Sequence, residues 1–383
     1  MQGTVLNSKP HFLLLDALRG VAALIVIWYH CYEGFATSVV TQGCNHGYLA
    51  VDFFFILSGF VIGYAYDDRL RDGSLTVRGF FRRRLVRLHP MVVFGVVFGA
   101  VCFFIGGRHN WDGETIPVRF VMLALLLNML MLPVIPGTRA DVRGNGEMFP
   151  LNGPHWSLFF EYIGNILYVL LLRKLPTRIL AVLTALLGAV LTYIVVTTGY
   201  LGIGWTLPDF RGGIVRMAFP YCAGMLLARC FICRAEKGSK PLLPQPIRKY
   251  AFWICTAVLL VLLPMPFIGS ESHPWQNGLY VSVIILVVFP ALIWTAAEGS
   301  AEGTGGWRRK AAGLLGDISY PLYAIHYPVM YLFYAFIGFP NVSKTMSETW
   351  PLALGAAAFC ILLAWVVMKF YDKPIRKKLS KTR

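Results

Sequence analysis

The stretch "RGVAALIVIWYH", residues 19–30, has an arginine and a histidine at the two ends of an apolar run. It lies inside a longer apolar segment, residues 12–33, which is long enough to cross the roughly 30 Å of hydrocarbon in a bilayer. Ionisable side chains at that depth are costly and usually face the interior of a helical bundle. At about 100° per residue, Arg19 and His30 return to within about 20° of each other around a helix. We therefore predict a membrane helix that carries both side chains along one inward stripe.

The composition excludes an ordinary water-soluble protein. Hydrophobic residues make up 57% of the 383 residues, and charged residues only 14%. Apolar runs recur along the whole chain, which predicts an all-α, polytopic membrane helix bundle. The runs lie near residues 12–33, 48–66, 90–106, 118–135, 156–172, 179–198, 213–230, 250–268, 278–297, 314–338 and 350–371.

The formal net charge of +16 reflects topology rather than a nucleic-acid partner. Lys and Arg cluster in short segments between the apolar runs, with seven Arg in 67–89 and six Lys or Arg in 229–249. In contrast, residues 34–47 contain neither Lys nor Arg. The positive-inside rule assigns the basic segments to the cytoplasm. We therefore expect binding to membrane lipids and no nucleic acid.

The same rule predicts that one apolar run does not cross the membrane. Three runs separate the basic segments 67–89 and 173–178, yet an even number of crossings must join two loops on the same side. The weakest of the three is 118–135, which contains Asn128 and Pro133. We predict that this run is re-entrant or interfacial. About ten transmembrane helices remain, with both termini cytoplasmic.

Three ionisable residues on separate runs, His30, Asp52 and Glu161, are predicted to lie at a similar depth below the outer surface. A histidine with a carboxylate neighbour can abstract a proton, because the carboxylate orients the ring and stabilises the imidazolium. Asp52, Glu161 and Glu33 remain alternative partners for His30. Plainer interpretations also stand: His30 as a hydrogen-bonded packing residue, and Arg19 as a snorkelling side chain paired with Asp16.

Residues 82–90, "RRRLVRLHP", open the third predicted helix from the basic side. Guanidinium groups can bind phosphates bidentately, as recognition of a nucleotide-like donor requires. The alternatives are ordinary positive-inside signalling or binding of anionic lipid head groups. Cys230 and Cys233 form a lone C-x-x-C without a second ligand pair, so no metal site is predicted.

In the tenth run, "ISYPLYAIHYP" places Tyr320, Tyr323 and His326 at positions i, i+3 and i+6 of a predicted helix. Pro321 and Pro328 are expected to break this helix. The pattern indicates either a kinked wall with a polar groove or a substrate channel.

Taken in order, these motifs resemble the acyltransferase 3 family of membrane acyltransferases. Arg19 and His30 match its Arg/Lys-x10-His signature, and "VDFFFILSGF" and "RRLVRLHP" match the blocks that follow. "WSLFFE", "LGDISYPLYAIHYP" and "YDKPIR" match three later blocks. Two positions depart from the pattern, since Ala50 replaces a common Gly and Asp372 replaces the usual Glu.

The resemblance implies transfer of an acyl group, most often acetyl from acetyl-CoA, to a hydroxyl of a carbohydrate or lipid-linked glycan at the bacterial inner membrane. His30 would act as the base or as the acyl carrier. The expected catalytic residues are His30, Asp52 and Glu161. The expected residues for acyl-CoA binding are Arg19, Arg83, Arg84 and Arg87, and those of the substrate channel are Ser58, Trp156, Tyr320, Tyr323 and His326.

One membrane domain, residues 1–383, is expected, with no appended soluble domain. If acyl delivery needs such a domain, a separate periplasmic protein would supply it. The leading alternative function is a transporter or flippase for a lipid-linked glycan or a small solute, since buried charges and kinked polar helices also mark translocation paths.

Overall fold

The computed structural model describes residues 11–300 and 306–381, and the ends of the predicted domain at 1–10 and 382–383 lie outside these ranges. The described residues form helices and no strand, which confirms the all-α prediction. The first half of the chain contains α1 (Leu13–Glu33), η1 (Gly47–Leu49), α2 (Ala50–Arg71), α3 (Val77–Ile105), α4 (Val118–Met129), α5 (His155–Leu170), η2 (Leu172–Lys174) and α6 (Thr177–Thr198). The second half contains α7 (Phe210–Glu236), α8 (Gln245–Lys249), α9 (Ala251–Leu262), α10 (Pro274–Val283), η3 (Ile284–Val288), α11 (Phe289–Gly299), α12 (Gly306–Ile337), α13 (Met346–Val367), η5 (Met368–Asp372) and α14 (Lys373–Lys381).

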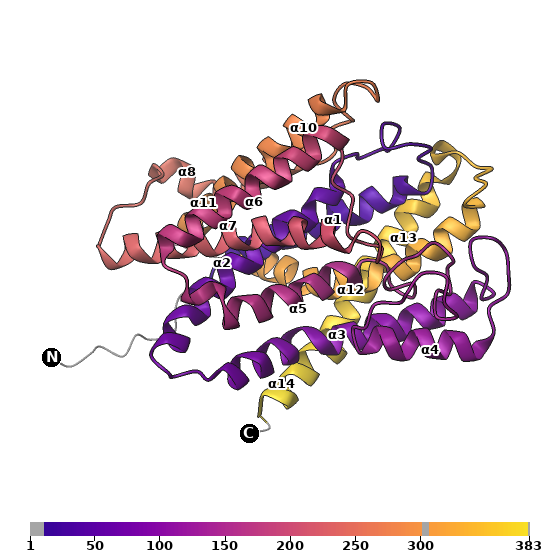
Figure 1. Ribbon diagram of the computed structural model, residues 1–383, viewed down its shortest axis with the longest axis horizontal. Coiled ribbons are helices and arrows are strands. Elements are labelled where there is room, and N and C mark those ends of the chain that lie inside the picture. The colour runs from indigo at the N-terminus through magenta and orange to yellow at the C-terminus, as the bar shows by residue number, and fades with distance from the viewer. Residues whose placement is uncertain (1–10, 301–305, 382–383) are drawn as a thin grey trace.

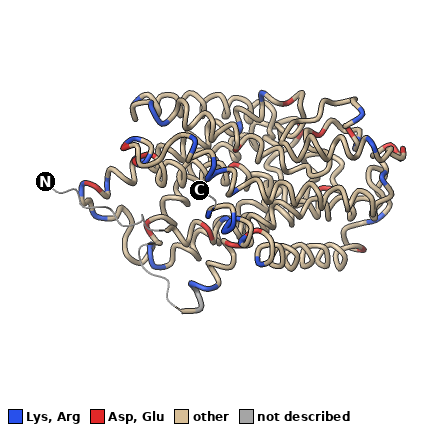
Figure 2. The backbone as a smooth tube through the Cα atoms, turned by 90° about the horizontal axis from the view of Figure 1, so that it is seen from below, with Lys and Arg blue, Asp and Glu red and all other residues tan. Residues whose placement is uncertain are grey.

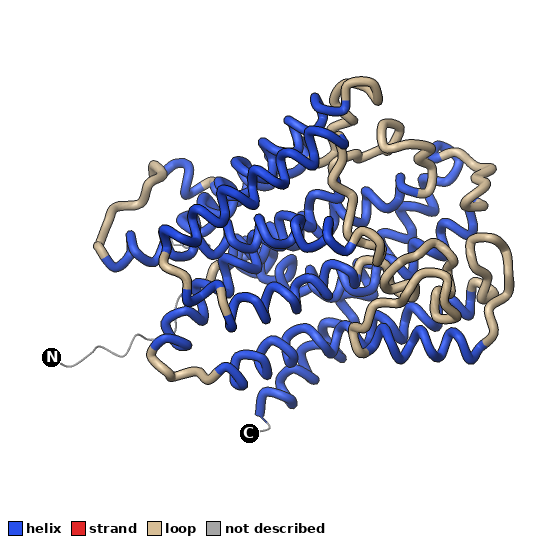
Figure 3. Tube along the Cα trace, in the orientation of Figure 1, coloured by secondary structure: helices blue, strands red, loops and turns tan. Residues whose placement is uncertain are grey.

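The long helices run side by side along the long axis of the molecule, with loops at both ends (Figures 1 and 3). Each of the eleven predicted apolar runs overlaps one or more of these helices. Within the described residues, eight helices are long and apolar enough to cross a membrane. Long stretches of the bundle carry no charged residue (Figure 2). The chain is therefore a multi-pass membrane protein.

The helix α4, like α9, is shorter than the eight long apolar helices. Its 12 residues span about 18 Å, which is less than the roughly 30 Å of hydrocarbon in a bilayer. It packs on α3 and lies beside only one end of that helix (Figure 1). Both described ends of the chain lie at the opposite end of the bundle (Figure 1). The position of α4 agrees with the predicted non-crossing segment, whereas the count of ten crossings, which includes the equally short α9, stays a prediction.

The segment between α4 and α5 folds into the bundle. Leu151 in this segment is fully buried, and a Cβ built on Gly99 of α3 would lie only 2.0 Å from its carbonyl oxygen. His155, the first residue of α5, is also fully buried. Irregular backbone is tolerated at membrane depth where protein surrounds it. As a result, α5 begins inside the bundle and not at its outer surface.

Close helix packing depends on small residues. α1 packs on α12, where a Cβ on Gly20 would lie 2.5 Å from the carbonyl oxygen of Leu315.

α12 remains one continuous helix through Pro321 and Pro328, so the expected break at these prolines is wrong. Neighbouring helices can accommodate a proline within a membrane helix, because they pack around the freed backbone groups.

The α2–α7 interface provides a test of this packing. A Cβ on Gly59 would lie 2.1 Å from the carbonyl oxygen of Tyr221, and backbone cannot move aside as a side chain can. We expect Gly59→Ala to lower the free energy of unfolding by about 1–3 kcal/mol. Gly355→Ala is the matched control, since no atom lies within 4 Å of its Cβ. Equal thermal unfolding midpoints of the two variants in detergent would contradict the expected close packing.

Candidate active site

An inner cavity of about 560 Å³ opens among α1, α2, α3, α5, α12 and α14, on the side of the bundle where the termini lie. Four arginines from three different helices line it: Arg19, Arg84, Arg87 and Arg376. Asp16, Glu161 and Asp317 also line the cavity, so its cationic groups outnumber its carboxylates. The cavity is therefore suited to an anionic ligand.

Three of these arginines are held by polar contacts, and one of these contacts is the ion pair of Arg376 with Asp372 at 2.5 Å. Arg19 donates to the hydroxyl of Ser319 at 2.8 Å and forms an ion pair with Asp16 at 3.1 Å. One carboxylate oxygen of Glu161 accepts hydrogen bonds from Arg84 at 2.6 Å and from Ser58 at 2.7 Å. These contacts fix the positions of the side chains at the cavity wall.

Within the described residues, some guanidinium nitrogens of the inner cavity have no hydrogen-bond partner. The Nε atoms of Arg84 and Arg376 are buried without a hydrogen bond. Arg87 lies over the ring of Tyr320 at 5.8 Å, and none of the ion pairs among the described residues includes it. Arg83 is exposed and does not line the cavity, although it was expected to bind the donor.

An outer cavity of about 300 Å³ lies beyond the inner one. Aromatic side chains dominate its wall: Tyr29, Tyr48, Trp111, Trp156, Tyr200, Trp205, Tyr323, Tyr327, Tyr331, Tyr334 and Phe339. Polar groups reach it from His30, Glu33, Asn145, Glu147 and Arg216. Aromatic faces combined with a few polar groups are typical of a site for a partly polar organic ligand.

His30 is paired with Glu33 in the outer cavity. Nδ1 of the imidazole lies 2.8 Å from a carboxylate oxygen of Glu33, which also accepts from Tyr334 at 2.8 Å and from Tyr327 at 3.2 Å. An ionised carboxylate can only accept, so it favours the tautomer of the neutral ring that has its proton on Nδ1 and its lone pair on Nε2. This geometry leaves Nε2 available as a base.

Arg19 and His30 share the predicted stripe. Arg19 contacts Ser319 of α12, and the ring of His30 stacks on His326 of the same helix at 5.3 Å. Both residues therefore face α12. They line different cavities, Arg19 the inner one and His30 the outer one.

Asp52 is bound to a different partner. Its carboxylate accepts hydrogen bonds from Nε and a terminal nitrogen of Arg216 on α7, at 2.9–3.2 Å, and both side chains are almost completely buried. Arg216 also donates to the carbonyl of Tyr48 at 2.9 Å, and its guanidinium lies 5.0 Å from the ring centre of Trp156. The ion pair therefore holds the wall of the outer cavity, and Asp52 does not orient His30.

Glu161 and His326 also lie elsewhere than expected. Glu161 belongs to the inner cavity, because α5 begins inside the bundle and its residues lie deeper than a count from the outer surface implies. His326 is fully buried and lines neither cavity; its Nδ1 lies 2.9 Å from the carbonyl of Tyr323. Of the other expected channel residues, Ser58 and Tyr320 line the inner cavity, Trp156 lines the outer cavity and Tyr323 lines both.

Glu147 is a second carboxylate in the outer cavity, in the segment that joins α4 and α5. It accepts hydrogen bonds from Tyr331 and from Asn145. Burial raises the pKa of this carboxyl from 4.5 to about 7, against the effect of its hydrogen bonds and of the nearby Arg143. Its charge therefore changes near neutral pH.

Several residues of the site were missed by the sequence analysis. Arg216 could have been found, because an arginine deep within an apolar run needs a buried partner. Tyr327, Tyr331 and Tyr334 continue the helical spacing of Tyr320 and Tyr323 along α12. No local pattern marks Glu147, which reaches the cavity only through the path of its loop.

The fold and the two cavities define a multi-pass membrane protein with a partly buried histidine–carboxylate pair in an aromatic cavity that adjoins a cationic one. A family model described as an acyltransferase domain matches residues 12–369. The chain therefore belongs to the acyltransferase 3 family.

Curated relatives differ in how much of the chain they match. The peptidoglycan O-acetyltransferase OatA of Listeria monocytogenes is 25% identical over 98% of this chain, which spans 58% of the length of OatA. Acyltransferase MdmB of Streptomyces mycarofaciens is 26% identical over 96% of this chain and 92% of its own length. Protein 2 in the picA locus of Rhizobium radiobacter is 36% identical over 42% of this chain and 83% of its own length. No solved structure matches the chain.

The raised pKa of Glu147 makes a testable contribution to stability. Between pH 4.5 and about 7 the folded protein keeps a proton on this carboxyl that the unfolded chain has lost. The contribution to the free energy of unfolding is therefore largest below pH 4.5 and falls as the pH rises to about 7. We expect Glu147→Gln to remove this part of the pH dependence of the thermal midpoint in detergent. Glu114→Gln, at an exposed loop position, should leave it intact; identical pH profiles for the wild type and both variants would contradict the assignment.

Proposed function

We propose that the protein is a membrane O-acyltransferase that moves an acetyl group from acetyl-CoA to a hydroxyl of a carbohydrate acceptor. The observation that carries the proposal is the His30–Glu33 pair, held at 2.8 Å in a cavity that adjoins an arginine-lined chamber. A poised base beside an anion site is what acyl transfer from a phosphate-bearing donor requires.

The inner cavity fits the donor. CoA carries several phosphates, and the cavity offers Arg87 without an ion pair and two guanidinium Nε atoms without partners. Arginine binds phosphate through paired donors, so Arg84, Arg87 and Arg376 would hold this end of the donor. The bound molecule supplies an activated acyl group as a thioester. Arg19 lies further along the same wall, on the helix that carries His30.

The chemical step follows from the geometry of His30. Nε2 accepts the hydroxyl proton while the acceptor oxygen forms a bond to the acyl carbon. As the carbon–sulfur bond breaks, the imidazolium returns this proton to the thiolate, so no proton is gained or lost. Glu33 stabilises the imidazolium, and Tyr327 and Tyr334 hold the carboxylate in place. A transient acyl-imidazole on His30 is the alternative route for the same net reaction.

The outer cavity fits a carbohydrate. Trp111, Trp156 and Trp205 offer broad apolar faces, and Asn145 and Glu147 offer hydrogen-bonding groups. The relative OatA is named for peptidoglycan, which is a carbohydrate polymer. Since the basic end of the bundle would face the cytoplasm, the aromatic cavity would face the periplasm of a bacterial inner membrane, with both termini cytoplasmic.

Substitution of the base tests the proposal. We expect His30→Ala to lower acetyl transfer from acetyl-CoA to glycan oligosaccharides at least about a hundredfold, because a positioned base contributes roughly 10²–10⁴ in rate. Glu33→Gln should lower it less, since the ring remains but loses its charged partner. Release of CoA and the mass of the acetylated glycan are the measurements. His273→Ala, at an exposed loop histidine, is the control. Near wild-type turnover by a folded His30→Ala protein would overturn the assigned role.

Donor binding is tested separately on the arginines. We expect Arg87→Ala to weaken CoA binding roughly tenfold or more, because a hydrogen bond to a charged group contributes about 1.5–3 kcal/mol. Arg83→Ala removes a neighbouring arginine that does not line the cavity and should leave the affinity unchanged. Titration of CoA into purified protein measures both. If Arg87→Ala binds CoA as tightly as the wild type does, the arginines of this segment do not bind the donor and act only as positive-inside signals for membrane topology.

A further inference from the structure

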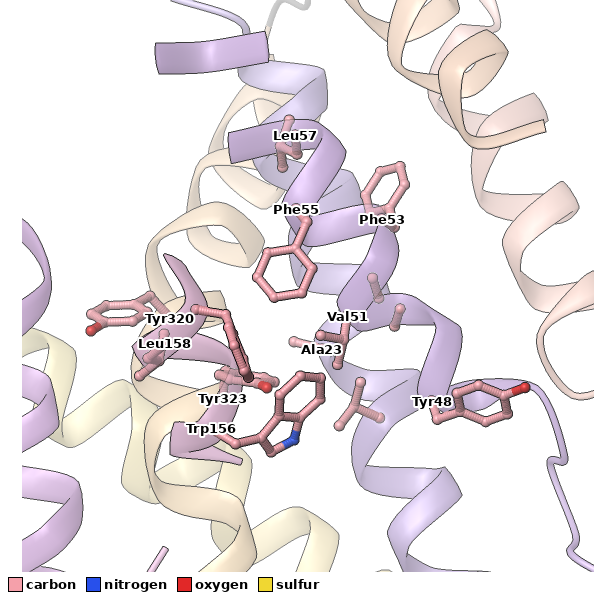
Figure 4. Packing of buried hydrophobic residues seen from close by; sticks show 14 of the residues in the cluster. Ala23, Tyr48, Val51, Phe53, Phe55, Leu57, Trp156, Leu158, Tyr320 and Tyr323 are labelled. Carbon is pink, nitrogen blue, oxygen red and sulfur yellow. The ribbon is translucent and has the colours of Figure 1, made fainter. Parts of the chain in front are cut away.

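The two cavities meet at a constriction. Val51 of α2 and Tyr323 of α12 are the residues that line both cavities. Trp156 lines the outer cavity, and Ser157, its neighbour in the chain, lines the inner one. Figure 4 shows Trp156 and Tyr323 on one side of this space, with Val51 and Phe55 on the other. The constriction is therefore formed by Val51, Trp156 and Tyr323.

The side chains of the constriction are fixed. The hydroxyl of Tyr323 lies 2.6 Å from that of Ser157 and donates to the carbonyl of Pro154 at 3.3 Å. The ring of Trp156 packs edge-on against Phe55. The guanidinium carbon of Arg216 lies 5.0 Å from the centre of the Trp156 ring. Val51, Trp156 and Tyr323 are only 6–8% exposed. Rings that are packed and hydrogen-bonded in this way cannot move aside cheaply for a bulky ligand.

The positions of the arginines and of His30 place the acyl group at this constriction. The phosphate-binding arginines line only the inner cavity, whereas His30 lines only the outer cavity. Along these two cavities, a thioester held by the arginines would reach the imidazole between Val51 and Tyr323, the two residues that the cavities share. The constriction must therefore accommodate the acyl carbons while the bulky part of the donor stays behind.

We infer that Val51, Trp156 and Tyr323 form the acyl subsite and limit the transferred group to a short, unbranched chain. This inference rests on the proposed function. Both ends of the path are polar, whereas the subsite itself is apolar apart from the hydroxyl of Tyr323, which is already hydrogen-bonded, and the indole N–H of Trp156. An uncharged acetyl group fits such a passage, and each further methylene meets the methyl groups of Val51 or an aromatic ring.

Widening the constriction tests the inference. With acetyl-, propionyl- and butyryl-CoA as donors, Val51→Ala should raise the ratio of propionyl to acetyl transfer about tenfold or more, since one methylene in a fitted pocket changes selectivity by at least about that factor. CoA affinity should stay at the wild-type value, because the arginines are untouched. Val97→Ala removes the same two methyl groups from the outward face of α3 and should leave the ratio unchanged.

Two further variants keep the test decisive if Val51→Ala folds poorly. Val51→Ile narrows the passage and should lower the propionyl ratio below that of the wild type. Ser157→Ala removes the hydrogen-bond partner of Tyr323 and should raise the ratio, though less than Val51→Ala. Folded variants with wild-type CoA affinity and an unchanged ratio would overturn the acyl subsite while leaving the acyltransferase intact. If the wild type transfers no acetyl group from acetyl-CoA, the proposed function itself fails.

Discussion

The ion pair between Asp52 and Arg216 is the interaction on which the centre of the molecule depends. It joins α2 to α7, and both charges are almost completely buried. Removing one partner would leave an uncompensated buried charge, and this would strongly lower the free energy of unfolding. Arg216 also holds Trp156 and the backbone of Tyr48, and Asp52 follows Val51 directly in the chain. One buried contact therefore supports two of the three residues where the cavities meet, Val51 and Trp156, and also the outer-cavity residue Tyr48.

Most of the fold could be predicted, because a membrane restricts which secondary structures can cross it and on which side the loops lie. Apolar length selects helices, and basic segments select the side on which loops lie. The same reasoning predicts that residues 118–135 do not cross, and these residues contain the short α4. It failed for Glu161, since the segment before α5 folds into the bundle and changes the depth at which that helix begins. Such an inward loop depends on tertiary packing, and the hydropathy of the chain does not reveal it.

In the candidate site, contacts between residues close in the chain could be predicted, whereas contacts between distant residues could not. The stripe of Arg19 and His30 follows from helical periodicity, and the partner of His30 is Glu33, one turn further along the same helix. The partner of Asp52 lies 164 residues away on α7, and no short-range spacing connects the two. Arg83 and Arg84 are adjacent in the chain, yet only Arg84 lines the inner cavity. Sequence indicated which residue types carry the chemistry, and packing decided which of them meet.

The narrow junction of the two cavities also bears on the electrical insulation of the membrane. If water filled the two cavities as one continuous column, protons and other ions could leak across the membrane and dissipate their gradients. The apolar ring faces of Trp156 and Tyr323, together with the branched side chain of Val51, interrupt such a water column at its narrowest point. Hydrated ions and hydronium lose their solvation there, whereas a neutral carbonyl compound loses little. The same three side chains that admit a small ester-forming group can thus preserve the voltage across the bilayer.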